Sequence, residues 1–157
     1  MVSKAQTPQM LFIYILAIVI FSAILLFGYS AVKNFREKEE KIGYVKFKSD
    51  LESIVRSIAT DYGSVKIRNF YVPSRYLEVC FVDPDGNGDI DYPLIKESVD
   101  SGSKDNVSLM KNKVVLGASF YVKGIELDNK LLCASVVDGK IKIRFEGLGN
   151  ATKISLP

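Results

Sequence analysis

The N-terminal part of the chain is dominated by one run of apolar residues. Residues 10–27 contain no charge over eighteen positions, and residues 28–32 extend the run to twenty-three. At about 1.5 Å per helical residue the run spans roughly 27–35 Å, which is enough to cross a hydrocarbon core of about 30 Å. The pattern predicts a transmembrane helix over residues 10–32, after a short leader or cytoplasmic segment of residues 1–9. A cleaved secretory signal is the alternative, although its apolar core usually spans about 7–15 residues.

Helical periodicity continues after the apolar run. Residues 33–41 are mostly charged, and the apolar residues that follow recur at spacings of three and four. This apolar stripe consists of Tyr44, Phe47, Leu51, Ile54, Val55, Ile58 and Tyr62. The spacing predicts an amphipathic helix over residues 33–62 that continues from the membrane and ends at Gly63. Gly43 and a capping-box pattern at residues 49–52 leave a break near residues 43–49 open, and we favour the continuous or gently kinked helix.

After Gly63 the hydrophobic period changes to two, which is typical of β-strands. The predicted strands are residues 64–72, 76–82, 114–122, 131–137, 140–145 and 152–156. In residues 140–145 apolar and basic side chains alternate, and Asp138-Gly139 before them is a strong hairpin signal. The apolar stripe of the helix needs a partner, which the inner face of an antiparallel sheet supplies. We therefore predict an α+β protein: a long N-terminal helix packed on a small antiparallel β-sheet in a head of residues 63–157.

Charge and composition argue against two classes of function. The chain has 21 Lys and Arg against 18 Asp and Glu, and it shows no stripe of basic and aromatic residues, so we predict no nucleic-acid partner. It has no histidine, which removes the commonest general base. Its serines lack a nucleophile motif, and no Gly-rich phosphate loop follows a predicted strand. The sequence predicts a protein that is not an enzyme.

The two cysteines, Cys80 and Cys133, each lie inside a predicted strand. If they pair, they close a long loop and stabilise the head by roughly 4 kcal/mol on the chain-entropy estimate. The alternative is two small buried residues in a reducing compartment. An even cysteine count in a small membrane-tethered domain favours the disulfide and, with it, an extracellular head.

Two further features bear on the orientation of the chain in the membrane. Asn106 and Asn150 each begin a glycosylation sequon, which favours an extracellular head. The basic residues that follow the apolar run indicate the opposite orientation, because positive charges near a membrane helix usually stay in the cytoplasm. These residues are Lys33, Arg36, Lys38 and Lys41. We predict an extracellular head, with a cytoplasmic head carrying free thiols as the alternative.

Residues 83–91 place oxygen-bearing side chains at alternate positions. The candidate ligands are Asp83, Asp85, Asn87, Asp89 and Asp91. Together with Gly88 they match the first nine positions of an EF-hand loop, and Ca²⁺ takes six to eight oxygen ligands of this kind. Leu94 occupies the twelfth position, where a bidentate glutamate would complete the shell. The motif predicts a calcium site that rigidifies the loop, and a plain solvated loop of turn-forming residues is the alternative.

The layout of the whole chain resembles that of archaeal type IV pilin-like proteins. These proteins have a short leader ending in a basic and a small residue, then Gln, a hydrophobic helix and a β-rich head; here Lys4-Ala5-Gln6 matches the leader. The resemblance implies a class III signal peptide, cleaved between Ala5 and Gln6 by a prepilin-type peptidase. It also implies a pilin-like fold and self-association through the N-terminal helix. Pilins usually carry glutamate five residues after the cleavage site, where this chain has Met10.

We therefore expect a membrane-anchored surface protein, a pilin-like structural subunit of an extracellular filament or surface complex. Its partners would be membrane lipid and other copies of itself. Small residues in the apolar helix would let neighbouring helices approach closely. They are Ala17, Ser22, Ala23, Gly28, Ser30 and Ala31. The alternative is a single-pass binding module with a calcium-stabilised extracellular domain.

Overall fold

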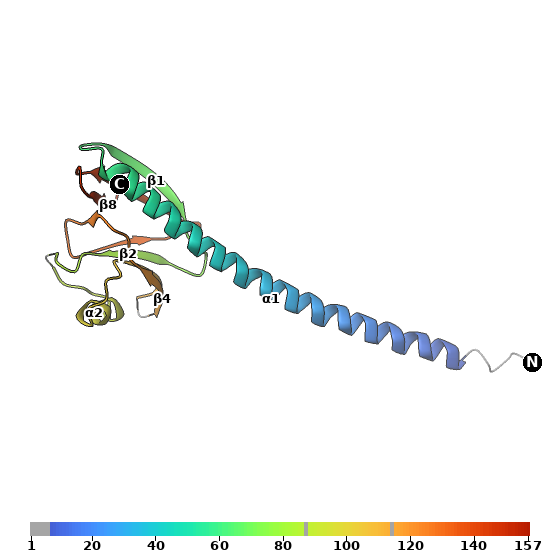
Figure 1. The fold of residues 1–157 in the computed structure, drawn as a ribbon. Helices are drawn as coiled ribbons and strands as arrows, with labels where there is room; N and C mark the ends of the chain where they lie inside the picture. Colours follow the sequence, from blue (N-terminus) through green and yellow to red (C-terminus); the bar gives the residue numbers. More distant parts are fainter. Residues whose placement is uncertain (1–6, 87, 114) are drawn as a thin grey trace, which may run out of the picture. The chain divides into compact units, whose positions relative to one another are not determined.

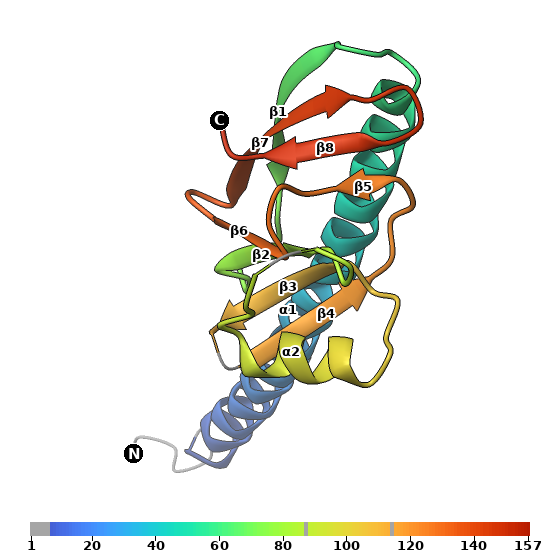
Figure 2. The same cartoon turned by 90° about the vertical axis from the view of Figure 1, so that its left-hand side faces the viewer.

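The computed structural model describes residues 7–86, 88–113 and 115–157, which form one long helix, one short helix and two small sheets (Figure 1, Figure 2). The chain divides into two compact units, Met1–Lys41 and Ile42–Pro157. Helix α1, Thr7–Ala59, supplies the described part of the first unit and the opening of the second. The predicted α+β class is confirmed.

Helix α1 continues through Gly43 and through the capping-box residues 49–52, so the alternative of a broken helix is not found. A glycine inside a helix costs roughly 1 kcal/mol relative to alanine. Its presence has a packing reason, because a Cβ on Gly43 would lie 3.1 Å from Cγ of Pro73. The glycine thus lets this part of the helix approach the segment that follows the first strand.

The end of α1 differs from the prediction. The helix ends at Ala59, and Tyr62, which the spacing placed on the buried stripe, is 84% exposed. The backbone N–H of Asp61 bonds to the carbonyl of Ile58, and that of Ser64 to Asp61, so the chain turns away from the helix here. Gly63 has a left-handed φ of 75°, which favours glycine and directs the chain into the first strand.

The first sheet has the strand order β1-β7-β8-β5. Its strands are β1 (Val65–Tyr71), β7 (Lys140–Gly147), β8 (Thr152–Ser155) and β5 (Ile125–Glu126). All pairs are antiparallel except β5 with β8, which is parallel. As the alternating pattern predicts, Ile141, Ile143 and Phe145 are buried.

The second sheet has the order β4-β3-β2-β6, with all pairs antiparallel. Its strands are β4 (Val115–Phe120), β3 (Val107–Asn112), β2 (Glu78–Val82) and β6 (Leu131–Ser135). The prediction of a single sheet is therefore wrong. Six of the strands were expected at roughly these positions, whereas β3 and β5 were not.

The core of the Ile42–Pro157 unit forms where α1 meets both sheets. Four side chains of α1 are at most 1% exposed: Phe47, Leu51, Val55 and Ile58. The Phe47 ring packs edge-on against Phe70 of the first sheet at 6.0 Å between centroids and against Phe120 of the second at 6.1 Å. One helix therefore covers the inner faces of both sheets. Each sheet is small, and it buries its apolar face against this shared helix.

The other face of the second sheet is covered by helix α2, Pro93–Asp100, which the sequence analysis did not predict. Pro93 begins the helix, where its missing N–H costs nothing. Ile95 is 2% exposed and belongs to a second apolar cluster. The other buried members of this cluster are Cys80, Val82, Ile90, Tyr92 and Met110.

Candidate functional site

The first candidate feature is the apolar part of α1. Among the described residues, α1 is the one helix long and apolar enough to cross a membrane. Every large apolar side chain between Met10 and Val32 is between 46% and 77% exposed. The hydroxyl of Ser22, within this range, donates to the carbonyl of Ile18 at 2.8 Å. Because that bond satisfies the Ser22 hydroxyl within the helix, this hydroxyl is compatible with the hydrocarbon core of a membrane, which contains no hydrogen-bonding groups.

The second feature is the disulfide between Cys80 and Cys133, which confirms the predicted pairing. The two residues face each other in the register of β2 and β6, with their Cα atoms 4.0 Å apart. The bond links positions 53 residues apart, for which the chain-entropy estimate gives about 4 kcal/mol. Cys80 is fully buried, so the disulfide is part of the cluster beneath α2.

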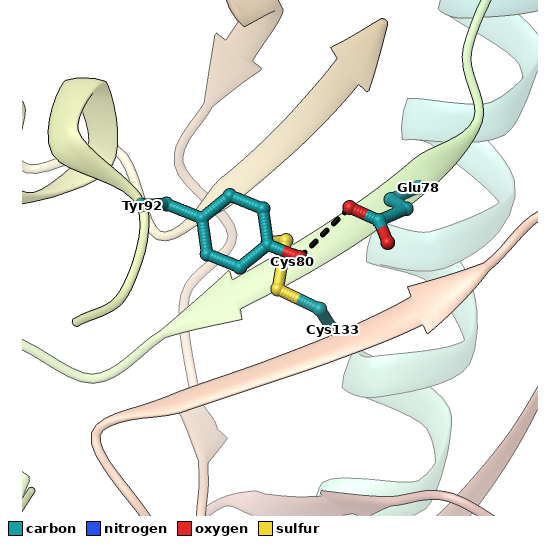
Figure 3. Close-up of a disulfide and its surroundings, with 4 residues drawn as sticks. All are labelled: Glu78, Cys80, Tyr92 and Cys133. Atoms are coloured by element: carbon teal, nitrogen blue, oxygen red, sulfur yellow. Dashed lines mark hydrogen bonds between the residues drawn. A yellow bond between two sulfur atoms is a disulfide. The ribbon is translucent and has the colours of Figure 1, made fainter. Parts of the chain in front are cut away.

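A tyrosine lies over this disulfide. Figure 3 shows the Tyr92 ring beside Cys80 and Cys133, with its hydroxyl directed at Glu78. The hydroxyl donates to the Glu78 carboxylate at 2.8 Å. Burial, then the hydrogen bond to Glu78 and the charge of that carboxylate raise the pKa of Tyr92 to about 12. Sequence analysis missed this contact, and the signal available for the nearby helix α2 is Pro93, since proline is favoured at the first position of a helix.

The acidic loop, residues 83–91, forms local hydrogen bonds that are typical of turns. Oδ1 of Asp83 accepts a hydrogen bond from the N–H of Asp85 at 3.1 Å, and the Asp83 carbonyl accepts one from Gly86. Oδ1 of Asp89 accepts from the N–H of Ile90 at 2.8 Å, and Lys96 lies 3.6 Å from the same oxygen. The bond from Ile90, and then Lys96, lower the pKa of Asp89.

These contacts give the calcium prediction no support. Within residues 7–86, 88–113 and 115–157, no group of three acidic, His or Cys side chains is placed to hold a metal ion. Asp83 and Asp89 already use an oxygen in local turns, and Asn87 lies outside the described residues. Calcium binding at residues 83–91 stays a prediction.

Both sequons contain residues that serve the fold. The Asn106 side chain is buried, and its amide donates to the carbonyl of Val122 and accepts from the N–H of Val122, each at 2.8 Å. A glycan on Asn106 would require these bonds to open. Asn150 is exposed, but Thr152 of the same sequon is fully buried and donates to the carbonyl of Val55 at 2.8 Å. Glycosylation at either site stays a prediction, and in the folded head only the Asn150 amide faces solvent.

The predicted cleavage site between Ala5 and Gln6 lies outside the described residues. Comparison of the chain with models of protein families, with curated proteins and with solved structures gives no match in any of the three. The exposed apolar helix and the disulfide-linked head are the features of the described residues that bear on function.

Proposed function

We propose that the chain is a membrane-anchored structural protein of the cell surface, whose apolar helices assemble side by side in a pilin-like filament or surface complex. The observation that carries the proposal is the exposure of the large apolar side chains from Met10 to Val32. Such a surface is stable only when lipid or other apolar helices cover it, because exposed apolar area in water is unfavourable.

The sequence of the apolar part of α1 is compatible with both environments, lipid and neighbouring apolar helices. Its length allows it to reside in the bilayer before assembly, and its small residues allow close helix contacts afterwards. Ala17, Ala23 and Gly28 are among these small residues, and a Cβ added to Gly28 would meet no atom of the protein within 4 Å. A neighbouring helix can therefore approach the backbone closely at Gly28.

The disulfide of the head supports the proposed location at the cell surface. It suits an oxidising exterior, because cytosolic thiols are usually kept reduced. The leader residues Lys4-Ala5-Gln6 support processing by a prepilin-type peptidase, after which Gln6 would be the first residue.

The test is the intact mass of the protein from native membranes and from the sheared surface fraction, with and without reductant. We expect a mass that lacks residues 1–5, that gains two hydrogens on reduction, and that is recovered in the sheared fraction. Replacing Ala5 by Phe should block cleavage and leave the full-length mass, whereas the control V2F should be processed normally. A full-length mass with free thiols, found in membranes alone, would contradict the proposal.

A further inference from the structure

In the described residues the two sheets have four end strands, and three of these are protected against pairing with another chain. Proteins usually block the outer edge of an end strand with inward-pointing charges, with covering side chains or by keeping the strand very short. In β1, Lys66 and Arg68 lie opposite buried residues of β7 and therefore project to the core side. The Tyr44 hydroxyl lies 3.4 Å from the carbonyl oxygen of Ser119 in β4, and β5 has only two residues.

The fourth end strand, β6, has an open edge. Its residues, Leu131–Ser135, include no charge and no proline. On the side of β2, the N–H of Val136 bonds to the carbonyl of Leu77 at 2.7 Å. Because the direction of the backbone groups alternates along a strand, the N–H and C=O groups of Cys133 and Ser135 point away from β2. On that side the sheet has no further strand among the described residues.

The open edge of β6 lines a groove between the two sheets. Val137 and Lys140 exchange two backbone hydrogen bonds, each at 2.9 Å, around the turn between β6 and β7. Beyond this pair β6 enters the second sheet and β7 enters the first, so the two strands part (Figure 2). The groove between them has a volume of about 360 Å³ and is lined by residues of both strands. Its size is typical of pockets that bind a ligand.

The groove is basic and partly apolar. Lys140 and Lys142 of β7 line it, and both are exposed on the face opposite the core, because Ile141 between them is buried. None of the described residues that line the groove is acidic. Val137 and Leu156, which also line it, are 66% and 47% exposed. The groove therefore offers two positive charges, exposed apolar surface and the backbone groups of an open strand edge.

We propose that this groove binds an extended, acidic segment of a partner protein, which adds to β6 as a further strand. The backbone of the segment pairs with the N–H and C=O groups of Cys133 and Ser135, and its carboxylates lie beside Lys140 and Lys142. In such strand addition the main-chain bonds supply affinity and alternate side chains supply specificity. Acidic residues at every second position of the segment share one face, because successive side chains of a strand point to opposite faces. The inference goes beyond the proposed function, which concerns the apolar helix, and gives the head a partner of its own.

The test measures binding of labelled peptides to the full chain in a neutral, non-ionic detergent by fluorescence anisotropy. The probe is a library of heptapeptides with glutamate at every second position and Val, Leu, Thr or Tyr at the others. We expect saturable binding of some members, and K140E/K142E should weaken the binding of these by at least about fivefold. The control K104E/K123E changes the same charge at exposed residues outside the groove and should stay within about twofold of the unaltered protein. Peptides with lysine in place of glutamate should bind at least about tenfold more weakly.

Three further measurements separate strand addition from attraction between charges alone. S135P removes an N–H that points away from β2, so it breaks no bond of the sheet and should weaken peptide binding by at least about fivefold. A peptide methylated at alternate backbone nitrogens keeps its charges, yet it should lose binding to the unaltered protein to a similar extent, which tests the backbone contact without any change in the head. Bound peptide should also slow hydrogen exchange of the Cys133 and Ser135 amides by at least about tenfold.

The outcomes that would overturn the inference are distinct. If no peptide of the library binds saturably, the docking site is refuted, and binding to vesicles of anionic lipid through Lys140 and Lys142 would then assign these lysines to a membrane surface. If K140E/K142E behaves like its control, the groove does not recognise acidic residues. If the methylated peptide binds normally and the two amides exchange as before, strand addition is wrong. None of these measurements requires the apolar helices to assemble, so they leave the proposed function to its own test.

Discussion

Replacing Thr152 by Val removes a single hydroxyl from the contact between β8 and α1. The side chain is fully buried, and its hydroxyl donates to the carbonyl of Val55 at 2.8 Å. Valine has nearly the same shape, so the substitution leaves no large cavity, and the cost is the lost hydrogen bond and a poorly satisfied carbonyl. We expect the free energy of unfolding to fall by about 1–2 kcal/mol.

The measurement is thermal unfolding of the full chain in detergent, followed by near-ultraviolet circular dichroism. For a unit the size of Ile42–Pro157, each kcal/mol corresponds to roughly 4 °C, so T152V should lower Tm by about 4–8 °C. The control T60V makes the same change at an exposed residue after α1 and should shift Tm by less than about 2 °C. If T152V and T60V shift Tm equally, the hydroxyl is not structural, and its place in the Asn150 sequon becomes the better explanation of the threonine.

Three further predictions follow from the head. Replacing Cys80 and Cys133 together by Ala should lower the free energy of unfolding by about 4 kcal/mol in urea titrations, and a loss below about 1 kcal/mol would contradict the chain-entropy reasoning. Because the pKa of Tyr92 is raised to about 12 from 10, its contribution to stability is complete below pH 10 and is lost as the pH rises towards 12. Y92F should make this loss smaller, and a stability profile unchanged by the substitution would show that another group titrates. The calcium site predicted at residues 83–91 is tested by Tm with Ca²⁺ and with EDTA: a rise in Tm with Ca²⁺ that D83N abolishes would support the site, and a Tm that neither reagent changes would contradict it.

Short-range signals in the sequence account for the parts of the fold that were predicted. The run of apolar residues, the stripe of the helix and the alternation in residues 140–145 are each visible within a few residues, and the corresponding elements are present. Strand β3 was missed because its apolar residues follow a polar stretch and the Asn106 sequon, which is typical of a loop. Strand β5 has two residues and pairs only with β8, so it leaves no periodic signal.

The contacts of the candidate site depend on residues far apart in the sequence, which no local pattern reveals. Thr152 and Val55 are 97 residues apart, yet their hydrogen bond gives a sequon threonine a structural role. Tyr92 and Glu78 are 14 residues apart and meet only because α2 folds back over β2. The cysteine pair was the exception, since two cysteines allow a single pairing.

The arrangement of the core also determines where the proposed membrane anchor can be separated from the head. Phe47 packs against Phe70 and Phe120 from different sheets, and Val55 binds Thr152, so residues 47–58 of α1 form a structural part of the head. Removing them would leave the inner faces of both sheets without their shared cover. The apolar residues 10–32 lie in the other compact unit, and their exposed side chains contribute nothing to this core. A head fragment therefore has to retain α1 from about Ile42 onward, since the same helix carries the proposed membrane anchor in its first half and forms the centre of the head core in its second.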